Sequence, residues 1–541
     1  MSGTATTRPT DGPTDAAAPA DRGDRTDAAP AAAGPPTGAE HLARLRDERC
    51  VHIDGERVTD VTTHPSMRNA ARSIARLYDA LHEPGRAELL TCPTDTGSGT
   101  RTHRFFRVAR DRGDLMASRD AIAEWARLTY GWMGRTPDYK ASLTATFGAN
   151  AGFYGPFADN ARRWYRRAQE ELPFLGHAIA NPPVDRHLPV EEIADVPVRV
   201  VRETDAGIVV SGAKVVATSA AIATHCFVGQ TPNTVSDDPA QAVAFVVPIA
   251  APGLRLICRP SYERAASRHG TPFDHPLSAR FDENDAILVL DEVLVPWEDV
   301  LIHRDPERVK AFFPRSGFVN GFLFHGCTRL AVKLDFLAGL LARTLRCTGG
   351  LGLRGKRAML GEVVALRHAV WSLASAMAAD PDPWTDGAVL PQKQAALAYC
   401  VLAPDAYPRV RDIVQRIVAS GLIYLPSSAA ELEDPDVGPL LARYVRGSDG
   451  VGHRERIKTL KLLWDAVGSE FGARHELYER NYAGGWEDIR LMVAGEAQAT
   501  GRLEAMEALV ERCLEDYDER GWTGGTWLAG EEADAPKRSA A

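Results

Sequence analysis

A short stretch in the first third of the chain combines the side chains best suited to catalysis. Residues 130–140 read YGWMGRTPDYK, and their glycine and proline place Arg135 and Tyr139 on irregular backbone, where binding residues concentrate. His177 follows, ahead of NPPVDR at 181–186. A neutral histidine can accept a proton near pH 7, an arginine stays charged and stabilises an anion, and a tyrosine is a directional donor and acceptor. The same residue types also serve as ion-pair partners and structural histidines, so the pattern alone leaves a structural role open.

Hydrophobic periodicity predicts the elements that carry these residues. Residues 39–182 are expected to form a helical N-terminal domain, because apolar residues recur there at helical spacing. From residue 183 the pattern changes to alternation interrupted by turn residues, which predicts a compact antiparallel β domain, barrel or sandwich, over 183–305. The clearest segments are helices at 65–82, 119–133 and 157–171 and strands at 243–249, 253–259 and 286–295.

Helical periodicity returns after the β region. Residues 306–528 are expected to form a C-terminal four-helix bundle with its apolar faces inward. The predicted fold class is therefore α+β, mainly α. Residues 1–38 contain too few large apolar residues to fold and are expected to be a disordered tail, and 529–541 a flexible one. The helical segments of the bundle are 328–346, 359–379, 391–420, 454–480 and 488–518.

The composition excludes several classes of protein. The chain has 541 residues, of which 45% are hydrophobic, and a net charge of −9, which argues against a nucleic-acid-binding surface. No apolar run reaches the roughly 18 to 20 residues of a membrane span. The first residues do not resemble a secretory signal, so a cytoplasmic protein is expected. The eight cysteines are scattered without metal-ligand spacing, which favours buried, reduced thiols over disulfides or zinc ligands.

Two apparent motifs have simpler explanations. Residues 350–355, GLGLRG, match the glycine pattern of dinucleotide-binding loops, but a helix rather than a strand precedes them. They are more simply a connection between two helices. His475-Glu476 is followed by Glu479 where a zinc-protease motif requires a second histidine. No phosphate-binding loop and no serine-hydrolase elbow is present, so these enzyme classes have no support.

Several longer segments together resemble the large, oxygenase component of the 4-hydroxyphenylacetate 3-hydroxylase family. The resemblance runs from about residue 39 to about residue 528. It implies an acyl-CoA-dehydrogenase-like fold and a homotetramer. It also implies a separate NAD(P)H-dependent flavin reductase, which supplies FADH2. The matching segments include RDAIAEWARLTYGWMGRTPDYKA (119–141), HAIANPPVDRHLP (177–189), TDAGIVVSGAKVVAT (204–218), SGLIYLPSS (420–428) and WDAVGSEFGARHELYERNY (464–482).

The resemblance also implies a reaction and roles for residues. Reduced FAD and O2 form a flavin C4a-hydroperoxide, whose distal oxygen attacks the ortho carbon of a phenol. By resemblance, Arg135, Tyr139 and His177 surround the phenol hydroxyl and the peroxide. Further residues are expected to contact the flavin, although helix capping and packing remain open as explanations. These are Pro183, Asp185, Arg186, Thr218, Ser469, Phe471, Gly472 and Arg474.

The substrate follows less directly from the resemblance. The loop after the GAKVVAT strand is expected to recognise the group para to the phenol, with Gln230 and Thr231 as hydrogen-bonding residues. No basic residue lies in this loop to select a carboxylate. The candidate substrates are 4-hydroxyphenylacetate and a tyrosine-derived phenol of secondary metabolism, free or bound to a carrier protein. A chlorophenol monooxygenase, an acyl-CoA-dehydrogenase-like flavoenzyme, a dehydratase with an iron–sulfur cluster and a non-catalytic assembly protein are the alternatives.

Overall fold

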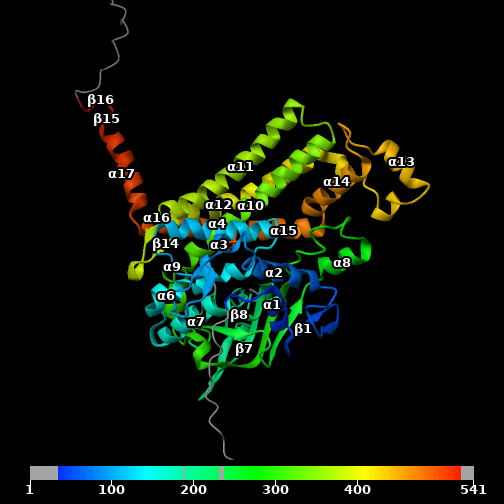
Figure 1. Cartoon of the computed structure of the whole chain (residues 1–541). Helices are drawn as coiled ribbons and strands as arrows, with labels where there is room; N and C mark the ends of the chain where they lie inside the picture. The colour runs from blue at the N-terminus through cyan, green and yellow to red at the C-terminus, as the bar shows by residue number, and fades with distance from the viewer. Residues whose placement is uncertain (1–33, 186, 189, 231–236, 525–541) are drawn as a thin grey trace, which may run out of the picture.

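The computed structural model describes residues 34–185, 187, 188, 190–230 and 237–524. Long helices form one end of the molecule, two β-sheets form the other, and N-terminal helices lie between them (Figure 1). This confirms the expected fold class, mainly helical α+β. In the described part of the chain, no helix is both long enough and apolar enough to cross a membrane.

The three expected N-terminal helices are present. Helix α2 is Arg68–Ala80, and α7 is Ala158–Glu171. Helix α4, Arg112–Leu128, begins earlier than its apolar pattern suggested, because the side chain of Asp111 accepts a hydrogen bond from the backbone N–H of Asp114 and caps the first turn. Shorter helices complete this region: α1 Gly38–Arg44, α3 Ala87–Leu90, α5 Ala141–Thr144 and α6 Thr146–Asn150.

The β region contains a six-stranded sheet, in the order β2-β1-β10-β11-β7-β6, and a four-stranded sheet, in the order β12-β9-β8-β5. Strands were expected only after residue 183, yet β1, β2 and β5 come from the preceding region. Most pairs are antiparallel as expected, but β1–β10 and β5–β8 are parallel. The bounds are β1 Cys50–Ile53, β2 Glu56–Val58, β5 Leu175–Ala178, β6 Arg199–Thr204, β7 Gly207–Thr218, β8 His225–Val228, β9 Val243–Pro248, β10 Leu254–Cys258, β11 Asp285–Pro296 and β12 Val300–His303.

The C-terminal helices differ from expectation in their breaks. The segments 454–480 and 488–518, each expected to be one helix, are two helices each. In the first segment, Ser469 caps the start of the second helix. In the second segment, Gly501 separates the two helices and has a left-handed φ of 71°. Residues 350–353 lie in the connection between α10 and α11, and residues 354–355 begin α11. The bounds are α10 Phe318–Cys347, α11 Arg354–Ala379, α12 Lys393–Val418, α13 Val437–Tyr444, α14 His453–Val467, α15 Glu470–Arg480, α16 Trp486–Ala499 and α17 Arg502–Glu515.

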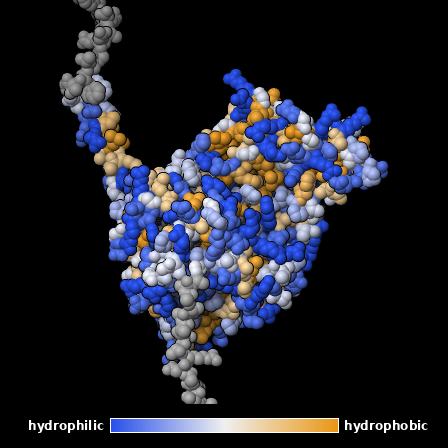
Figure 2. Space-filling view, in the orientation of Figure 1, coloured by the Kyte–Doolittle hydropathy of each residue, from blue (hydrophilic) through white to orange (hydrophobic). Residues whose placement is uncertain are grey.

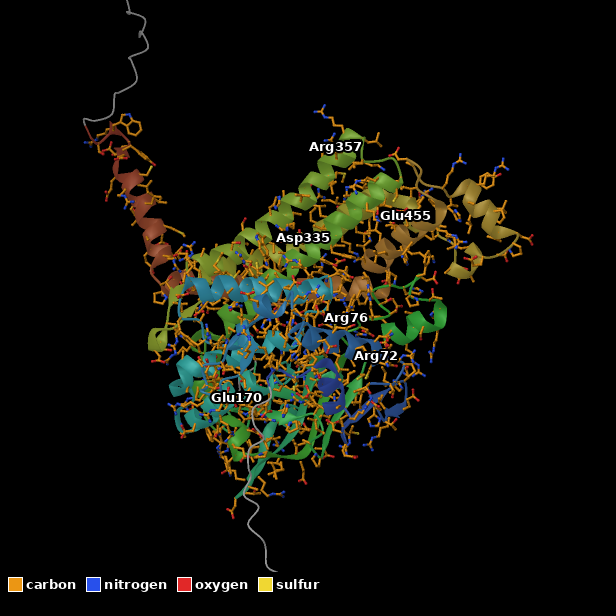
Figure 3. The ribbon with its side chains drawn as sticks, viewed as in Figure 1. Arg72, Arg76, Glu170, Asp335, Arg357 and Glu455 are labelled. Atoms are coloured by element: carbon orange, nitrogen blue, oxygen red, sulfur yellow. The ribbon has the colours of Figure 1, made fainter. Side chains whose placement is uncertain are left out.

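Apolar packing rather than surface charge holds the long helices together. Helix α10 is buried along most of its length. Apolar residues also reach the surface over the upper end of the bundle (Figure 2). Figure 3 labels Asp335 on α10 and Glu455 on α14, which pair with Arg367 and Arg343 respectively. Exposed pairs of this kind contribute only about 0–1 kcal/mol each.

One buried charge cluster ties α15 to α10. Both oxygens of the Glu479 carboxylate accept from the Arg329 guanidinium at 2.7 Å, and one also accepts from Lys333 Nζ at 2.9 Å. All three side chains are buried. Burial alone would raise the pKa of Glu479, but the two cations outweigh it and lower that pKa to about 2. The cluster fixes the helix that carries the C-terminal site residues.

Removing the charge of Glu479 is expected to destabilise the protein strongly. Glu479→Gln leaves two buried cations without their anion, which costs about 3–5 kcal/mol of unfolding free energy. Because the folded-state pKa lies below the usual 4.5, this contribution is present above about pH 4.5 and is lost as the pH falls toward 2. Urea denaturation at pH 7 measures it. Glu362→Gln, which breaks the exposed pair with Arg409, is the control and should cost at most about 1 kcal/mol. Equal losses in both variants would contradict this account.

Candidate active site

The segment that carries Arg135 is held by one carboxylate of the β region. An oxygen of Glu283 accepts from the backbone N–H groups of Gly134 at 2.6 Å and Arg135 at 2.5 Å. Gly134 has no room for a side chain, since a Cβ atom there would overlap the ring of Tyr478. The chain therefore passes close to α15, and the Arg135 side chain enters a buried space between three aromatic rings.

Arg135 is stacked rather than ion-paired. Its guanidinium carbon lies 4.1 Å from the ring centre of Tyr139, 4.8 Å from that of Tyr482 and 5.1 Å from that of Tyr478. The Tyr482 hydroxyl donates to the backbone oxygen of Phe322 at 2.9 Å, which fixes that ring. Nε and Nη1 of Arg135 are buried and have no partner among the described residues. Cation–π contacts thus hold a guanidinium whose N–H groups remain available to a bound acceptor.

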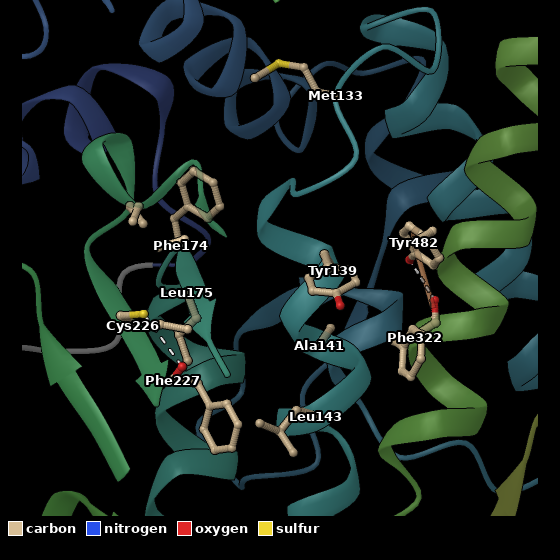
Figure 4. Packing of buried hydrophobic residues seen from close by; sticks show 14 of the residues in the cluster. Met133, Tyr139, Ala141, Leu143, Phe174, Leu175, Cys226, Phe227, Phe322 and Tyr482 are labelled. Carbon is tan, nitrogen blue, oxygen red and sulfur yellow. Dashed lines mark hydrogen bonds between the residues drawn. The ribbon is translucent and has the colours of Figure 1, made fainter. Parts of the chain in front are cut away.

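Tyr139 and His177 face one another across the site. Their ring centres are 5.3 Å apart, and Tyr139 also packs edge-on against His325. In Figure 4, Tyr139 lies between β8, with Cys226 and Phe227, and α10 with the adjacent Tyr482. His177 reaches this position because β5 pairs in parallel with β8, which brings it opposite Phe227.

His177 is held in its neutral form. Burial lowers its pKa well below the usual 6.5, and the nearby charges of Lys140 and Arg135 lower it further. Its Nδ1 atom is buried and finds no partner in the described part of the chain. Burial also raises the pKa of the Tyr139 hydroxyl. The site therefore offers a neutral imidazole, a protonated phenol side chain and a guanidinium in one water-poor space.

Thr218 and Arg474, far apart in sequence, meet at Asp285. Thr218 Oγ1 donates to Asp285 at 2.6 Å, and Arg474 donates to both carboxylate oxygens at 2.7 and 3.0 Å. Burial would raise the pKa of Asp285, but the charge of Arg474 and that of Arg259 outweigh it and lower the pKa below its usual range. Arg474 also lies 3.4 Å from Glu283. One chain of hydrogen bonds and ion pairs thus joins the expected cofactor residues to the backbone of Arg135.

The other expected cofactor residues of the C-terminal region lie at the start of α15. Ser469 caps this helix by accepting from the N–H of Gly472 at 3.1 Å. Phe471 is buried against Trp132, with ring centres 5.5 Å apart. A Cβ on Gly472 would lie 2.6 Å from the backbone oxygen of Ala466. Capping and packing account for these three residues within the subunit, and their contact with a flavin stays a prediction.

The other residues expected to contact the flavin or the substrate show no comparable contacts with Arg135, Tyr139 or His177. Asp185 is exposed and accepts from the N–H of His187 at 2.9 Å, and Pro183 is also exposed. Arg186 and Thr231 lie outside the described residues. Gln230 is buried, and both ends of its amide are already used: it accepts from Lys214 Nζ at 2.8 Å and donates to the backbone oxygen of Gln241 at 3.0 Å. Its contact with a substrate stays a prediction.

Sequence reasoning missed four residues that build the site. The two acids lie in FDEND at 281–285, where the pattern showed only a strand beginning. The two tyrosines are four residues apart in LYERNY, a spacing that puts them on one helical face but is usually explained by packing. These residues are Glu283, Asp285, Tyr478 and Tyr482.

The chemistry of the site fits a bound flavin and phenol. Arg135 Nε and Nη1, which donate, and His177 Nδ1, which can accept, are buried there without a partner in the described structure; the hydroxyl of Ser219, beside Thr218, is also unpartnered. Buried polar groups normally have partners, so these atoms indicate a ligand that offers acceptors to Arg135 and a hydroxyl to His177. FAD presents acceptors on its ring and pyrophosphate, and a phenol presents one oxygen.

Comparison with known proteins agrees with this geometry. Residues 37–302 match the family model described as 4-hydroxyphenylacetate 3-hydroxylase N terminal, and residues 309–511 match its C-terminal counterpart. The 4-hydroxyphenylacetate 3-monooxygenase oxygenase component of Pseudomonas aeruginosa is 57% identical over 90% of this chain and 94% of its own.

Two further similarities cover nearly the whole chain. A Streptomyces globisporus monooxygenase that is named for a (3S)-3-amino-3-(3-chloro-4-hydroxyphenyl)propanoyl group on a peptidyl-carrier protein is 53% identical over 90% of this chain and 92% of its own. A crystal structure of the oxygenase component of 4-hydroxyphenylacetate 3-monooxygenase, complexed with FAD and 4-hydroxyphenylacetate, has a TM-score of 0.82. It is 31% identical and covers 88% of this chain and 99% of that one.

The close approach at Gly472 yields a test of the α15 junction. Gly472→Ala forces a methyl group against the backbone of α14, which cannot yield as a side chain can, and should lower the unfolding free energy by about 1–3 kcal/mol. Thermal unfolding measures the change. Gly361→Ala is the control: Gly361 lies inside α11 with open space around it, so alanine there should leave stability unchanged or raise it by up to about 1 kcal/mol. A Gly472→Ala protein as stable as the control would show that the junction is loose.

Proposed function

Because the chain belongs to the 4-hydroxyphenylacetate 3-hydroxylase family, we propose that it is the oxygenase component of a two-component, FADH2-dependent monooxygenase that hydroxylates a para-substituted phenol beside its hydroxyl group. This proposal rests on one observation. Arg135, Tyr139 and His177 pack together in a buried space, and polar atoms of Arg135 and His177 have no partner there among the described residues. O2 is the co-substrate, and a separate NAD(P)H-dependent reductase supplies the reduced flavin.

The residues of the site prepare the phenol for attack. Reduced FAD, when bound, supplies the reaction with O2 that activates one oxygen atom. His177, neutral and unpartnered at Nδ1, accepts the phenolic proton and so raises the electron density of the ortho carbon. Arg135 stabilises the resulting negative charge with Nε and Nη1, and Tyr139 orients the hydroxyl. The surrounding aromatic rings exclude water.

The remaining residues would hold the flavin. Arg474 and Thr218 are fixed by Asp285, and the capped start of α15 offers backbone N–H groups near them. Pro183, Asp185 and Arg186 belong to the same proposal through the resemblance. A second reading, as an acyl-CoA-dehydrogenase-like enzyme, needs a carboxylate free to take a proton from carbon. Glu283 and Asp285, the two carboxylates described above, are both engaged by Arg474, which does not favour it.

The phenol is 4-hydroxyphenylacetate or a tyrosine-derived compound. The relatives support both, since one is named for 4-hydroxyphenylacetate and another for a group on a carrier protein. We also place the protein in the cytoplasm, where NAD(P)H is available. All eight cysteines are free thiols, as suits a reducing compartment.

A homotetramer is part of the proposal. Helix α17 projects away from the body of the protein (Figure 1) and carries apolar residues that Figure 2 shows on its surface. An apolar stripe of this size on a projecting helix is typical of a surface covered by another subunit. The exposed residues of the α17 stripe are Leu503, Met506, Leu509, Val510 and Leu514.

Substitution of the catalytic residues should abolish most hydroxylation. Arg135→Ala and His177→Ala should each lower the rate about 100-fold or more, because each removes a charge-stabilising or proton-accepting group. The measurement is product formation with 4-hydroxyphenylacetate and saturating FADH2 from a purified reductase. Arg162→Ala, at an exposed position on α7, is the control and should keep the wild-type rate. Wild-type rates in either site variant would overturn the assigned roles.

Disrupting the α17 stripe should break the assembly. The double variant Met506→Glu, Leu509→Glu puts charge into the contact and should reduce the mass in light scattering from that of four chains. Glu507→Gln with Glu511→Gln changes the polar positions of the same helix and should leave the mass unaltered. A wild-type protein that is monomeric, or a double variant that keeps four chains, would exclude this role of α17.

A further inference from the structure

Lys140 is a buried lysine whose amino group has no hydrogen-bond partner among the described residues. In the described part of the chain, four lysines are almost completely buried. Lys214 and Lys333 donate to an amide oxygen and a carboxylate respectively, and Lys461 forms an ion pair with Asp274. Lys140, only 1% exposed, has no acceptor for its Nζ atom among the described residues. Burying an amino group without an acceptor costs about 2–7 kcal/mol, so this arrangement indicates an acceptor that arrives with a ligand.

Aromatic rings and the catalytic residues surround the Lys140 amino group. Nζ lies 4.4 Å from the ring centre of Phe318, 4.9 Å from that of Tyr139 and 5.4 Å from that of Phe227. Phe227 is on β8, opposite His177 on β5, and directly precedes the segment expected to recognise the para group. Lys140 thus lies beside Tyr139 and beside Phe227, the strand residue that pairs with His177.

The para-recognition segment itself supplies no cation. Its second residue, Gly229, lies beside the ring of Phe227, and the side chain of Gln230 is turned to Lys214 and Gln241. Lys140 is the cation that the fold brings to this end of the site from the opposite element, the turn Pro137–Lys140.

We propose that Lys140 recognises an anionic para substituent, a carboxylate, and so selects free phenolic acids over neutral or thioester-linked phenols. This inference rests on the proposed function and narrows its substrate class. The ammonium group would bind the carboxylate beside the rings of Tyr139, Phe227 and Phe318, where low polarity strengthens the pair. A carrier-bound substrate presents an uncharged thioester in the corresponding place and would leave Lys140 without a partner.

Binding of an acid should favour the charged, ammonium form of Lys140. Burial lowers the pKa of Lys140 well below the usual 10.5, and the charge of Arg135 lowers it further, whereas Cys226 acts in the opposite direction. The other titratable neighbours are His177, which is neutral, and Tyr139, whose pKa is raised. A carboxylate beside the amine favours the ammonium form, so binding takes up a proton where the free amine is deprotonated.

The decisive variant is Lys140→Met, which keeps the length of the side chain and removes its charge. We expect KM for 4-hydroxyphenylacetate to rise about 10-fold or more, as for loss of a charged hydrogen bond, while kcat/KM for 4-methylphenol changes less than about 3-fold. Lys140→Arg should retain preference for the acid. Lys356→Met, outside the site, should behave as wild type. FADH2 affinity should be unchanged, and thermal stability should not fall, since an unsatisfied buried group is removed.

Other outcomes overturn the inference. Equal losses on the acid and on 4-methylphenol would make Lys140 a general catalytic or structural residue, and weaker FADH2 binding would assign it to the cofactor. If wild type hydroxylates neither phenol, the proposed function fails. Calorimetric binding of 4-hydroxyphenylacetate then still decides on Lys140. The inference requires tighter binding to wild type than to Lys140→Met; equal affinities contradict it.

Discussion

The carboxylate of Glu283 is the constraint on which the geometry of the site depends. It accepts two backbone N–H groups, those of Gly134 and Arg135, and lies beside Arg474. Through Arg474 the same interaction reaches Asp285 and Thr218. A turn between N-terminal helices, the edge of the β region and a C-terminal helix are therefore joined at one point. Movement of any of them would displace Arg135 relative to the residues proposed to hold the flavin.

Desolvation gives the site its chemical character. Aromatic rings rather than acids surround Arg135, so its charge is retained without being neutralised inside the protein. The same burial keeps His177 neutral and able to accept a proton. The buried cluster of Glu479, Arg329 and Lys333 lies next to the aromatic rings around Arg135 and keeps α15 in place. A site built in this way contributes orientation and electrostatics, which is what a protein must add to flavin chemistry.

Local patterns predicted most elements but few of the contacts between them. Helical periodicity located α2, α4 and α7, and the motif segments pointed to Arg135, Tyr139 and His177. The parallel pairing of β5 with β8, which positions His177, joins strands from different regions and leaves no turn signal in the sequence.

Local sequence patterns also could not predict the helix breaks or the acids that pair with Arg474. Ser469 interrupts an apolar periodicity that continues through both α14 and α15, so the segment looked like one helix. In the sequence, Glu283 and Asp285 are only two acids near the start of a strand. Their pairing with Arg474, which lies on a helix far along the chain, is visible only in the fold. Lys140 could be identified as exceptional only from its burial, because its neighbours come from three separate elements.

The most direct test of the account is the source of the oxygen in the product. The protein, FADH2 generated by a separate reductase and 4-hydroxyphenylacetate would be allowed to react under ¹⁸O2, and the product analysed by mass spectrometry. The account predicts one ¹⁸O atom in a product hydroxylated beside the original hydroxyl group, and no product when the reduced flavin is omitted. Product without ¹⁸O, or oxidation of the flavin with neither this phenol nor a tyrosine derivative hydroxylated, would contradict it.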